Sequence, residues 1–437
     1  MRIPRLFGTA LATTLLLTVA APVASAAARP AAAPAALDPA SLGRTLDAVH
    51  DAGMYGIYSS VRDGSDRWAG ASGVADVDTG RPVRADMRHR IGSISKTFAA
   101  VAVLQQVERG RIRLDAPIGD YLPDLIPGER GREITVRMLL NHTSGIGDYV
   151  LSAFPSLAQG STASLDEDRF RSVPPEELVR LGLAAPATGR PGEKWSYSNT
   201  NYVIAGLLLA KVTGQDPEAY ITRHVIDRAG LRHTSYPRSA YIQGPHARMY
   251  ENFYGLIDPP RDYSVYDMSW AYTAGAIVST TDDLNRFYRA LLGGRLVGPE
   301  ALRQMQTTVP AGGGMNYGLG IYFVDVTGCG RFWGHDGAVF GAGTVALSSP
   351  DGSRQVAVGW NLMKYERLNS DGTGFEPSPI DDALNHYVVA ALCPSATPAS
   401  ARTAATSLRR ILTGTGTGTG TVTGTDLSPA PWAAVLR

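Results

Sequence analysis

Cysteine is nearly absent from this chain. Its 437 residues include only Cys329 and Cys393, which are too few and too far apart in sequence to hold a zinc ion. In an oxidising compartment an isolated pair favours a disulfide over two free thiols. We therefore expect one disulfide, and an activity that uses no metal or cofactor.

Lysine and net charge are also scarce. Only four lysines stand among the 41 basic residues, and the formal net charge is +1. This balance gives no electrostatic reason for binding nucleic acid or an anionic membrane surface. The scarcity of lysine makes the position of Lys96 informative.

An apolar run near the N-terminus is too short for a stable membrane span. Arg2 and Arg5 precede this run, which covers residues 6–19, and the small residues Ala24-Ser25-Ala26 follow it. The pattern is typical of a secretory signal peptide over residues 1–26, cleaved near Ala26. We expect a secreted, extracellular protein that works as a monomer.

Composition changes again on either side of a predicted folded domain. Residues 27–37 are rich in alanine and proline, and residues 394–437 contain a Gly-Thr repeat. Neither stretch has the apolar content to form a core. We expect a disordered linker, one domain over residues 38–393, and a disordered tail.

Strand-like runs lie toward both ends of this domain, with helices between them. The predicted strands are 54–61, 67–74, 317–326, 331–335, 343–348 and 355–361. The predicted helices begin near residues 38 and 93 or cover 134–141, 175–184, 199–213, 216–229, 281–292 and 381–392. This order predicts a mixed α/β (α+β) fold, in which an antiparallel sheet formed by both chain ends is flanked by helices. An all-helical region is inserted at about residues 97–310, and the crevice beside it is the natural place for a site.

The first motif that carries chemistry is Ser93-Ile94-Ser95-Lys96. If a helix begins at Ser93, the serine and lysine share one face. A serine hydroxyl needs a nearby base to act as a nucleophile at neutral pH, and a desolvated lysine can lose its proton. Alone, the motif also fits a solvated helix.

The second motif is Tyr197-Ser198-Asn199. A phenol held against an ammonium can work as a phenolate base. The carboxamide of Asn199 can hold a substrate amide or steady the lysine. The alternative is a polar loop whose asparagine caps a helix.

The third motif, His335-Asp336-Gly337, lies on a strand-like run. Gly337 lets a substrate backbone approach the strand edge, and the N–H of Ala338 can pair with that of Ser93 to hold an oxyanion. The alternative is an ordinary turn with a satisfied histidine. A Ser-His-Asp triad fits poorly because neighbours on a strand point to opposite faces, and the chain has no G-x-S-x-G elbow.

Five ordered motifs resemble the serine hydrolases grouped with class C β-lactamases and actinomycete D-alanyl-D-alanine carboxypeptidases. They are residues 90–98, 139–145, 195–202, 274–280 and 334–337. The resemblance, which spans about residues 40–393, implies that Ser93 forms the acyl-enzyme and that Lys96 and Tyr197 move its proton. It further implies that Asn199 contacts the substrate amide and that the N–H groups of Ser93 and Ala338 form the oxyanion hole. His335 would stand where many relatives have a lysine, and Trp270 would line the cleft. The resemblance also implies a disulfide between Cys329 and Cys393.

Two departures from this pattern concern the substrate. Asp336 stands where the carboxypeptidases have threonine, and Tyr322 lies in the segment where relatives place an arginine for the substrate's terminal carboxylate. A carboxylate about 4 Å from Asp336 would be repelled by about 4 kcal/mol at an effective dielectric of about 20.

The resemblance still implies a D-alanyl-D-alanine carboxypeptidase that acts on peptidoglycan stem peptides and meets β-lactams. One alternative is an esterase. Another is a D-aminopeptidase or D-amidase, because Asp336 could pair with a substrate ammonium. A third, from another class, is a catalytically dead cell-wall binding protein.

Overall fold

The computed structural model describes residues 37–312, 315–326, 328–369 and 375–394. The expected signal peptide lies outside these residues. So do the expected linker, except residue 37, and the expected tail, except residue 394. Export, the linker and the tail therefore stay predictions.

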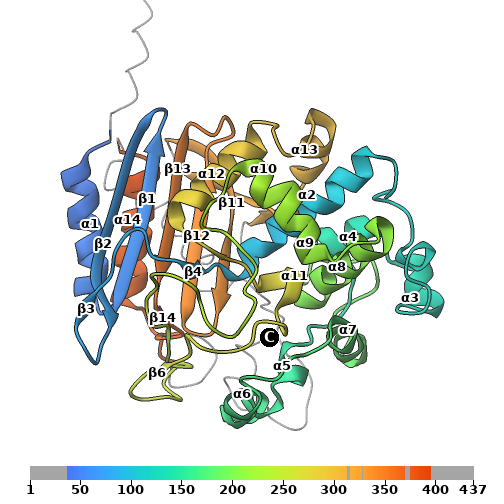
Figure 1. The fold of residues 1–437 in the computed structure, drawn as a ribbon, viewed down its shortest axis with the longest axis horizontal. Coiled ribbons are helices and arrows are strands. Elements are labelled where there is room, and N and C mark those ends of the chain that lie inside the picture. The colour runs from blue at the N-terminus through green and yellow to red at the C-terminus, as the bar shows by residue number, and fades with distance from the viewer. Residues whose placement is uncertain (1–36, 313–314, 327, 370–374, 395–437) are drawn as a thin grey trace, which may run out of the picture. The chain divides into compact units, whose positions relative to one another are not determined.

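A nine-stranded antiparallel sheet unites the two ends of the described chain, in the order β3-β2-β1-β13-β12-β11-β10-β9-β8 (Figure 1). Its strands are β1 (Gly56–Asp63), β2 (Asp66–Asp76), β3 (Arg81–Pro82), β8 (Val309–Pro310), β9 (Asn316–Tyr317), β10 (Tyr322–Val326), β11 (Gly330–Val339), β12 (Ala342–Ser348) and β13 (Arg354–Trp360). Pairing of β1 with β13 joins the early strands to the late ones. The predicted antiparallel sheet is confirmed.

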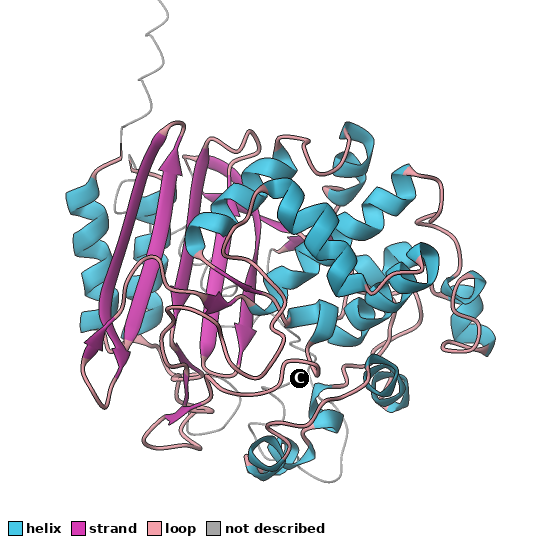
Figure 2. Cartoon of the chain, viewed as in Figure 1, coloured by secondary structure: helices cyan, strands magenta, loops and turns pink. Residues whose placement is uncertain are grey.

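Helices cover both faces of this sheet, as Figures 1 and 2 show. Helices α1 (Pro39–Asp51) and α14 (Pro379–Leu392) pack on each other and on one face, and α12 (Thr281–Leu292) packs on β1, β12 and β13. The start of α1 is fixed by Asp38, whose carboxylate accepts hydrogen bonds from the first backbone N–H groups. Its buried side chains recur with helical spacing at Leu42, Leu46 and Val49.

The helical region is built around two helices that are buried on nearly all sides, α2 (Ser95–Glu108) and α8 (Asn199–Thr213). They pack on each other and on α11 (Tyr272–Gly275). The remaining helices and helical turns are η1 (Gly92–Ile94), η2 (Ile118–Asp120), α3 (Gly128–Glu133), α4 (Val136–Leu140), α5 (Val150–Ala153), η3 (Pro155–Gln159), α6 (Ala163–Glu167), α7 (Pro175–Ala184), α9 (Pro217–Ile221), the π-helical η4 (Thr222–Ile226), α10 (Asp227–Ala229) and α13 (Pro299–Met305).

The inserted region is not wholly helical. Its strands β5 (Tyr250–Glu251), β6 (Arg261–Asp262) and β7 (Val278–Ser279) form two small sheets with β4 (His89–Arg90) and β14 (Leu362–Met363), which lie outside the region. Such two-residue strands have no periodicity that a sequence pattern could reveal.

The strand predicted over 317–326 is broken in two, between β9 and β10. Gly320 has a positive φ of 73°, and a Cβ there would lie 2.7 Å from the hydroxyl oxygen of Tyr202. Its carbonyl accepts a hydrogen bond from the hydroxyl of Thr97 in α2 at 2.7 Å. A tight turn therefore replaces the strand where the sheet meets α2.

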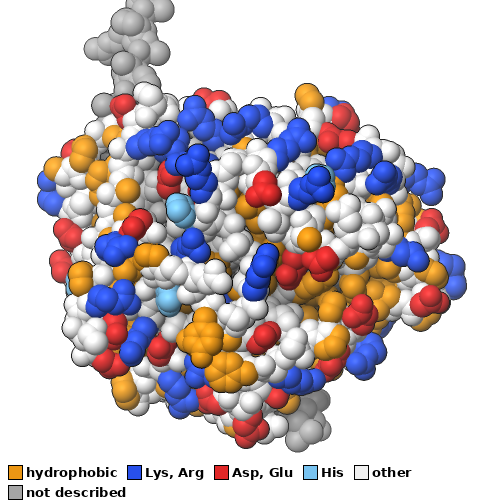
Figure 3. Space-filling view, in the orientation of Figure 1, with side chains coloured by type: hydrophobic (Ala, Val, Ile, Leu, Met, Phe, Trp, Pro, Cys, Tyr) orange, Lys and Arg blue, Asp and Glu red, His pale blue; other side chains and the backbone are white. Residues whose placement is uncertain are grey.

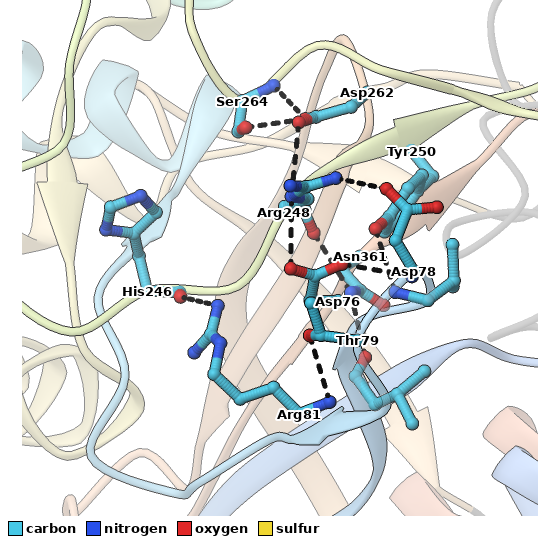
Figure 4. Close-up of polar contacts among 12 residues, drawn as sticks. Asp76, Asp78, Thr79, Arg81, His246, Arg248, Tyr250, Asp262, Ser264 and Asn361 are labelled. Atoms are coloured by element: carbon cyan, nitrogen blue, oxygen red, sulfur yellow. Dashed lines mark hydrogen bonds and ion pairs between the residues drawn. The ribbon is translucent and has the colours of Figure 1, made fainter.

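Arg248 fastens the edge of the main sheet to the β5–β6–β14 sheet (Figure 4). Its guanidinium contacts the carboxylates of Asp76 at 3.3 Å, Asp78 at 2.6 Å and Asp262 at 3.8 Å. Asp76 is the last residue of β2 and Asp78 lies just after it, whereas Asp262 belongs to β6. One guanidinium thus links the two sheets.

The visible surface mixes charges of both signs, with no field of one sign (Figure 3). This agrees with the net charge of +1. Among the described residues, no helix combines the length and the apolar character needed to cross a membrane.

Candidate active site

Ser93 and Lys96 meet at the N-terminus of α2. Ser93 lies in the 3-10 turn η1, and α2 itself begins at Ser95, two residues later than the helix start predicted from the sequence. Gly92 has a positive φ of 49°, so the chain enters the helix through a turn. The side chains still meet, with Lys96 Nζ 2.9 Å from Ser93 Oγ.

Lys96 is completely buried and is held by three oxygens. Besides Ser93, Nζ contacts the Asn199 carboxamide oxygen and the Ala274 carbonyl oxygen, each at 2.8 Å. Burial lowers the pKa of Lys96 to about 7, against the opposing influence of the carboxylates of Asp148 and Asp336. Near neutral pH a large fraction of this amine is therefore unprotonated.

Tyr197 completes the predicted catalytic group from the other side of the serine. Its phenol donates a hydrogen bond to Ser93 Oγ at 2.7 Å. Burial raises the pKa of Tyr197 well above its ordinary value, and only the contact with Ser93 opposes that change. The phenol is thus protonated, and Lys96 Nζ lies over the ring, 4.9 Å from its centroid. The phenolate anticipated from the sequence is therefore disfavoured at neutral pH.

Asn199 steadies the lysine, which is one of the two roles considered for it. While its carboxamide oxygen accepts from Lys96, its Nδ2 donates to the Asp148 carboxylate at 2.8 Å. The same carboxylate oxygen accepts from the Asn199 backbone N–H at 2.7 Å, at the start of α8. Sequence reasoning missed Asp148, and it gave no role to Ala274, which opens the motif 274–280, because a backbone carbonyl carries no signal in the residue type.

The backbone of β11 lies against the turn that carries Ser93. A Cβ on Gly92 would lie 2.7 Å from the backbone N of Ala338, and a Cβ on Gly337 would lie 2.9 Å from that of Ser93. Strand β10 pairs with β11 only as far as Gly334, so the exposed Ala338 lies beyond that pairing. The two backbone N–H groups expected to hold an oxyanion are thus brought together.

The ring of His335 is held by two hydrogen bonds, neither of which is to Ser93, Lys96 or Tyr197. Because a carbonyl can only accept, its Nδ1–H donates to the Asp336 carbonyl at 2.5 Å, and its Nε2 accepts from the Tyr317 hydroxyl at 2.8 Å. The ring is 2% exposed, and burial lowers the pKa of His335 to about 3. A neutral, fully bonded imidazole cannot supply the positive charge of the lysine that relatives have here.

Asp336 faces the site. Its side chain is 33% exposed, unlike that of His335 next to it. Partial burial raises the pKa of Asp336 to about 6, while the hydroxyl of Tyr322 and the charge of Lys96 oppose the rise. At neutral pH the carboxylate is therefore mostly ionised, and its charge acts on Lys96 and Tyr197.

Trp270 forms part of an aromatic wall next to the end of β11. Its ring packs edge-on against Phe154 at 5.4 Å and tilted against Phe340 at 5.2 Å, and its carbonyl accepts from the Tyr149 hydroxyl. Trp270 also lines a cavity of about 90 Å³ with Phe154, Val173 and other residues of the helical region.

Cys329 and Cys393 are joined by a disulfide, as expected. It ties the turn before β11 to the end of α14. In the described part of the chain, no cluster of three or more His, Cys, Asp or Glu residues could hold a metal ion.

The fold is similar to that of a solved amidohydrolase. A D-stereospecific amidohydrolase from Streptomyces sp. is 34% identical, and the similarity covers 82% of this chain and 100% of that one, with a TM-score of 0.71.

Two curated relatives are similar over shorter stretches. Esterase EstB of Burkholderia gladioli is 35% identical over 207 residues, which are 45% of this chain and 52% of the esterase. Penicillin-binding protein 4* of Bacillus subtilis is 26% identical over 289 residues, which are 63% of this chain and 61% of that protein. The chain thus spans about half to three fifths of these relatives. Residues 31–375 match the family described as Beta-lactamase, and the chain belongs to this family of serine hydrolases.

Proposed function

We propose that this chain is a secreted hydrolase that forms an acyl-enzyme on Ser93 and acts on amides or peptides of D-amino acids bearing a free ammonium group. The observation that carries the proposal is the partly exposed Asp336 carboxylate, whose charge acts on Lys96 and Tyr197, the two side chains bonded to Ser93 Oγ. The disulfide supports the predicted export, because such bonds persist in oxidising compartments.

The contacts of Lys96 assign its protons. A neutral amine has two N–H donors and one lone pair. The Asn199 carboxamide oxygen and the Ala274 carbonyl oxygen can only accept, so they take both donors. The lone pair is then directed to the third partner, the Ser93 hydroxyl. Lys96 is the base for the attack.

Acylation follows from this arrangement. Ser93 Oγ bonds to the substrate carbonyl carbon while its proton passes to Lys96, and the N–H groups of Ser93 and Ala338 stabilise the oxyanion. The C–N bond then breaks, and the leaving nitrogen takes a proton through the Tyr197 hydroxyl. The net change is one proton moved from Ser93 to the amine, with an ester formed on Ser93. Water releases the acid by the reverse path.

Charge in the site favours a cationic substrate group. Asp336 and Asp148 both act electrostatically on Lys96, so two carboxylates surround one amine that is partly neutral at pH 7. A substrate ammonium about 4 Å from Asp336 would gain about 4 kcal/mol at an effective dielectric of about 20, whereas a carboxylate would lose as much. The similarity to a D-stereospecific amidohydrolase supports the same substrate class.

A D-alanyl-D-alanine carboxypeptidase of peptidoglycan stem peptides is the second candidate, favoured by the similarity to penicillin-binding protein 4*. It would have to place the terminal carboxylate away from Asp336. Because the chain is similar to EstB, hydrolysis of an ester is also measured in the test below. The close contacts among Ser93, Lys96 and Tyr197 argue against a catalytically dead binding protein.

The test compares four substrates: D-phenylalanine amide, its N-acetyl derivative, an N-acetylated peptide ending in D-alanyl-D-alanine, and a nitrophenyl ester. The free amide should be turned over best, and N-acetylation should lower kcat/KM by about a hundredfold or more, the equivalent of about 3 kcal/mol. Asp336→Asn should remove most of that preference. Asp325→Asn, at an exposed carboxylate on β10 paired with Arg331, is the matched control. Preference for the blocked D-alanyl-D-alanine peptide would overturn the proposed substrate.

A further inference from the structure

We infer that His142 is a positioning residue for Tyr197, acting as a clamp on the three-residue segment that carries the phenol. The inference rests on the acyl-transfer function proposed for Ser93. It assigns to this buried histidine a role in the rate of the reaction, without contact to the substrate.

His142 contacts each residue of the segment Ser196–Ser198. Its backbone carbonyl accepts from the Ser196 N–H at 2.8 Å. Its Nδ1 accepts from the Ser198 N–H at 3.3 Å. Its ring lies on that of Tyr197, with the centroids 4.3 Å apart and the planes tilted by 34°. The main chain of His142 therefore holds the backbone before the phenol, and its ring holds the backbone after the phenol and the plane of the phenol itself.

The hydrogen bonds also fix the state of the imidazole. Nδ1 is approached by a second donor, Nδ2 of Asn201, at 3.2 Å, and Asn201 is oriented by the Ser144 hydroxyl, which donates to its Oδ1 at 2.6 Å. Since both neighbours of Nδ1 are donors, the ring proton must be on Nε2, and the ring is neutral. Burial and the nearby Lys96 and His335 hold the pKa of His142 well below its ordinary range.

The site is costly for a residue that serves packing alone. His142 is fully buried, its φ is +60°, and within the described residues its Nε2 has no hydrogen-bond partner. A buried donor without a partner costs about 1–3 kcal/mol, and a positive φ is uncommon outside glycine. An apolar residue would avoid the first cost but could not accept from Ser198. The clamp is the property that only the histidine supplies.

Two substitutions separate the ring contact with Tyr197 from the hydrogen bond that Nδ1 accepts from Ser198. His142→Asn keeps a side-chain acceptor near the position of Nδ1 and suits the left-handed backbone, but it removes the ring. His142→Phe keeps the ring and removes the acceptor. His50→Asn, at a histidine in α1 whose Nδ1 bonds to the Met54 carbonyl, is the control for the exchange itself.

We expect kcat for D-phenylalanine amide to fall at least tenfold in both variants while KM stays within about twofold, because Tyr197 acts on the reacting atoms. His142→Asn should retain more activity than His142→Phe, since the acceptor for Ser198 remains. His50→Asn should behave like the wild type. Thermal unfolding identifies any variant that does not fold. If one of the two His142 variants does not fold, kcat and KM of the other one test the role of His142.

Folded variants with unchanged kcat, or with KM as the only altered constant, would overturn the role of His142. The variant Ser93→Ala distinguishes failure of the role of His142 from failure of the acyl-enzyme function. If Ser93→Ala is inactive while the His142 variants match the wild type, only the clamp is refuted. If Ser93→Ala retains activity, the acyl-enzyme function is refuted, and the clamp with it.

Discussion

Gly337 is packed so closely against Ser93 that no side chain fits between them. A Cβ at position 337 would stand 2.9 Å from the backbone N of Ser93 and 2.0 Å from the carbonyl oxygen of Ile91. Both contacts are with backbone, so rotation of a side chain cannot relieve them. The glycine is what allows the strand edge and the nucleophile turn to form one oxyanion-binding surface.

Gly337→Ala should therefore separate Ala338 from Ser93 and lower kcat/KM by about a hundredfold or more, the cost of losing one oxyanion donor. Steady-state kinetics on the preferred amide measure the loss. Gly43→Ala is the control, because nothing lies within 4 Å of a Cβ at that helical position. The control should keep full activity and gain up to about 1 kcal/mol of stability. Equal activity of the two variants would contradict the assigned oxyanion hole.

The rate should depend on the ionisation of Lys96. Its pKa is lowered to about 7, and only the neutral amine can take the proton of Ser93. For a nitrophenyl ester, which carries no titrating group, kcat/KM should rise about tenfold per pH unit below pH 7 and level off above it. A flat profile between pH 5 and 8 would exclude the amine as the base.

Asp336→Asn should shift that profile in a defined direction. The Asp336 carboxylate raises the pKa of Lys96 by stabilising its ammonium form, so its removal should lower that pKa. The acid limb of kcat/KM for the ester should move to lower pH, while Asp325→Asn leaves it in place. A shift to higher pH would show that Asp336 does not face the lysine.

Local patterns were enough to predict the central part of the site. Ser93 and Lys96 are three residues apart, and the turn that replaces the first turn of the helix preserves their contact. Gly337 was expected to admit a substrate backbone, and the structure places the backbone of Ile91 and Ser93 against it.

Contacts between distant segments could not be read in the same way. Ala274 reaches Lys96 because α11 packs on α2, and Asp148 reaches Asn199 from the loop between α4 and α5. The ring of His335 is bonded to Tyr317, a residue of another strand, so the sequence alone could not decide between a substrate-binding histidine and one whose hydrogen bonds are satisfied within the protein. The break between β9 and β10 depends on Tyr202 and Thr97 next to Gly320. Each of these follows from tertiary packing.

The disulfide should contribute to stability but not to chemistry. Cys329 and Cys393 close a loop of 64 residues, for which chain entropy predicts about 4 kcal/mol of stabilisation. Replacing both cysteines with serine should lower the free energy of unfolding by roughly 2–5 kcal/mol, and leave kcat of the folded variant unchanged. Denaturant unfolding with and without reductant measures this, and equal midpoints would show that the bond does not form.

The identity of the nucleophile is the central claim, and covalent labelling tests it most directly. The protein is treated with a serine-directed fluorophosphonate, digested, and analysed by peptide mass spectrometry. We expect a single adduct, on the peptide that contains Ser93, absent after Ser93→Ala and greatly slowed after Lys96→Met. An adduct on a different serine, or undiminished labelling and turnover in Ser93→Ala, would contradict the account.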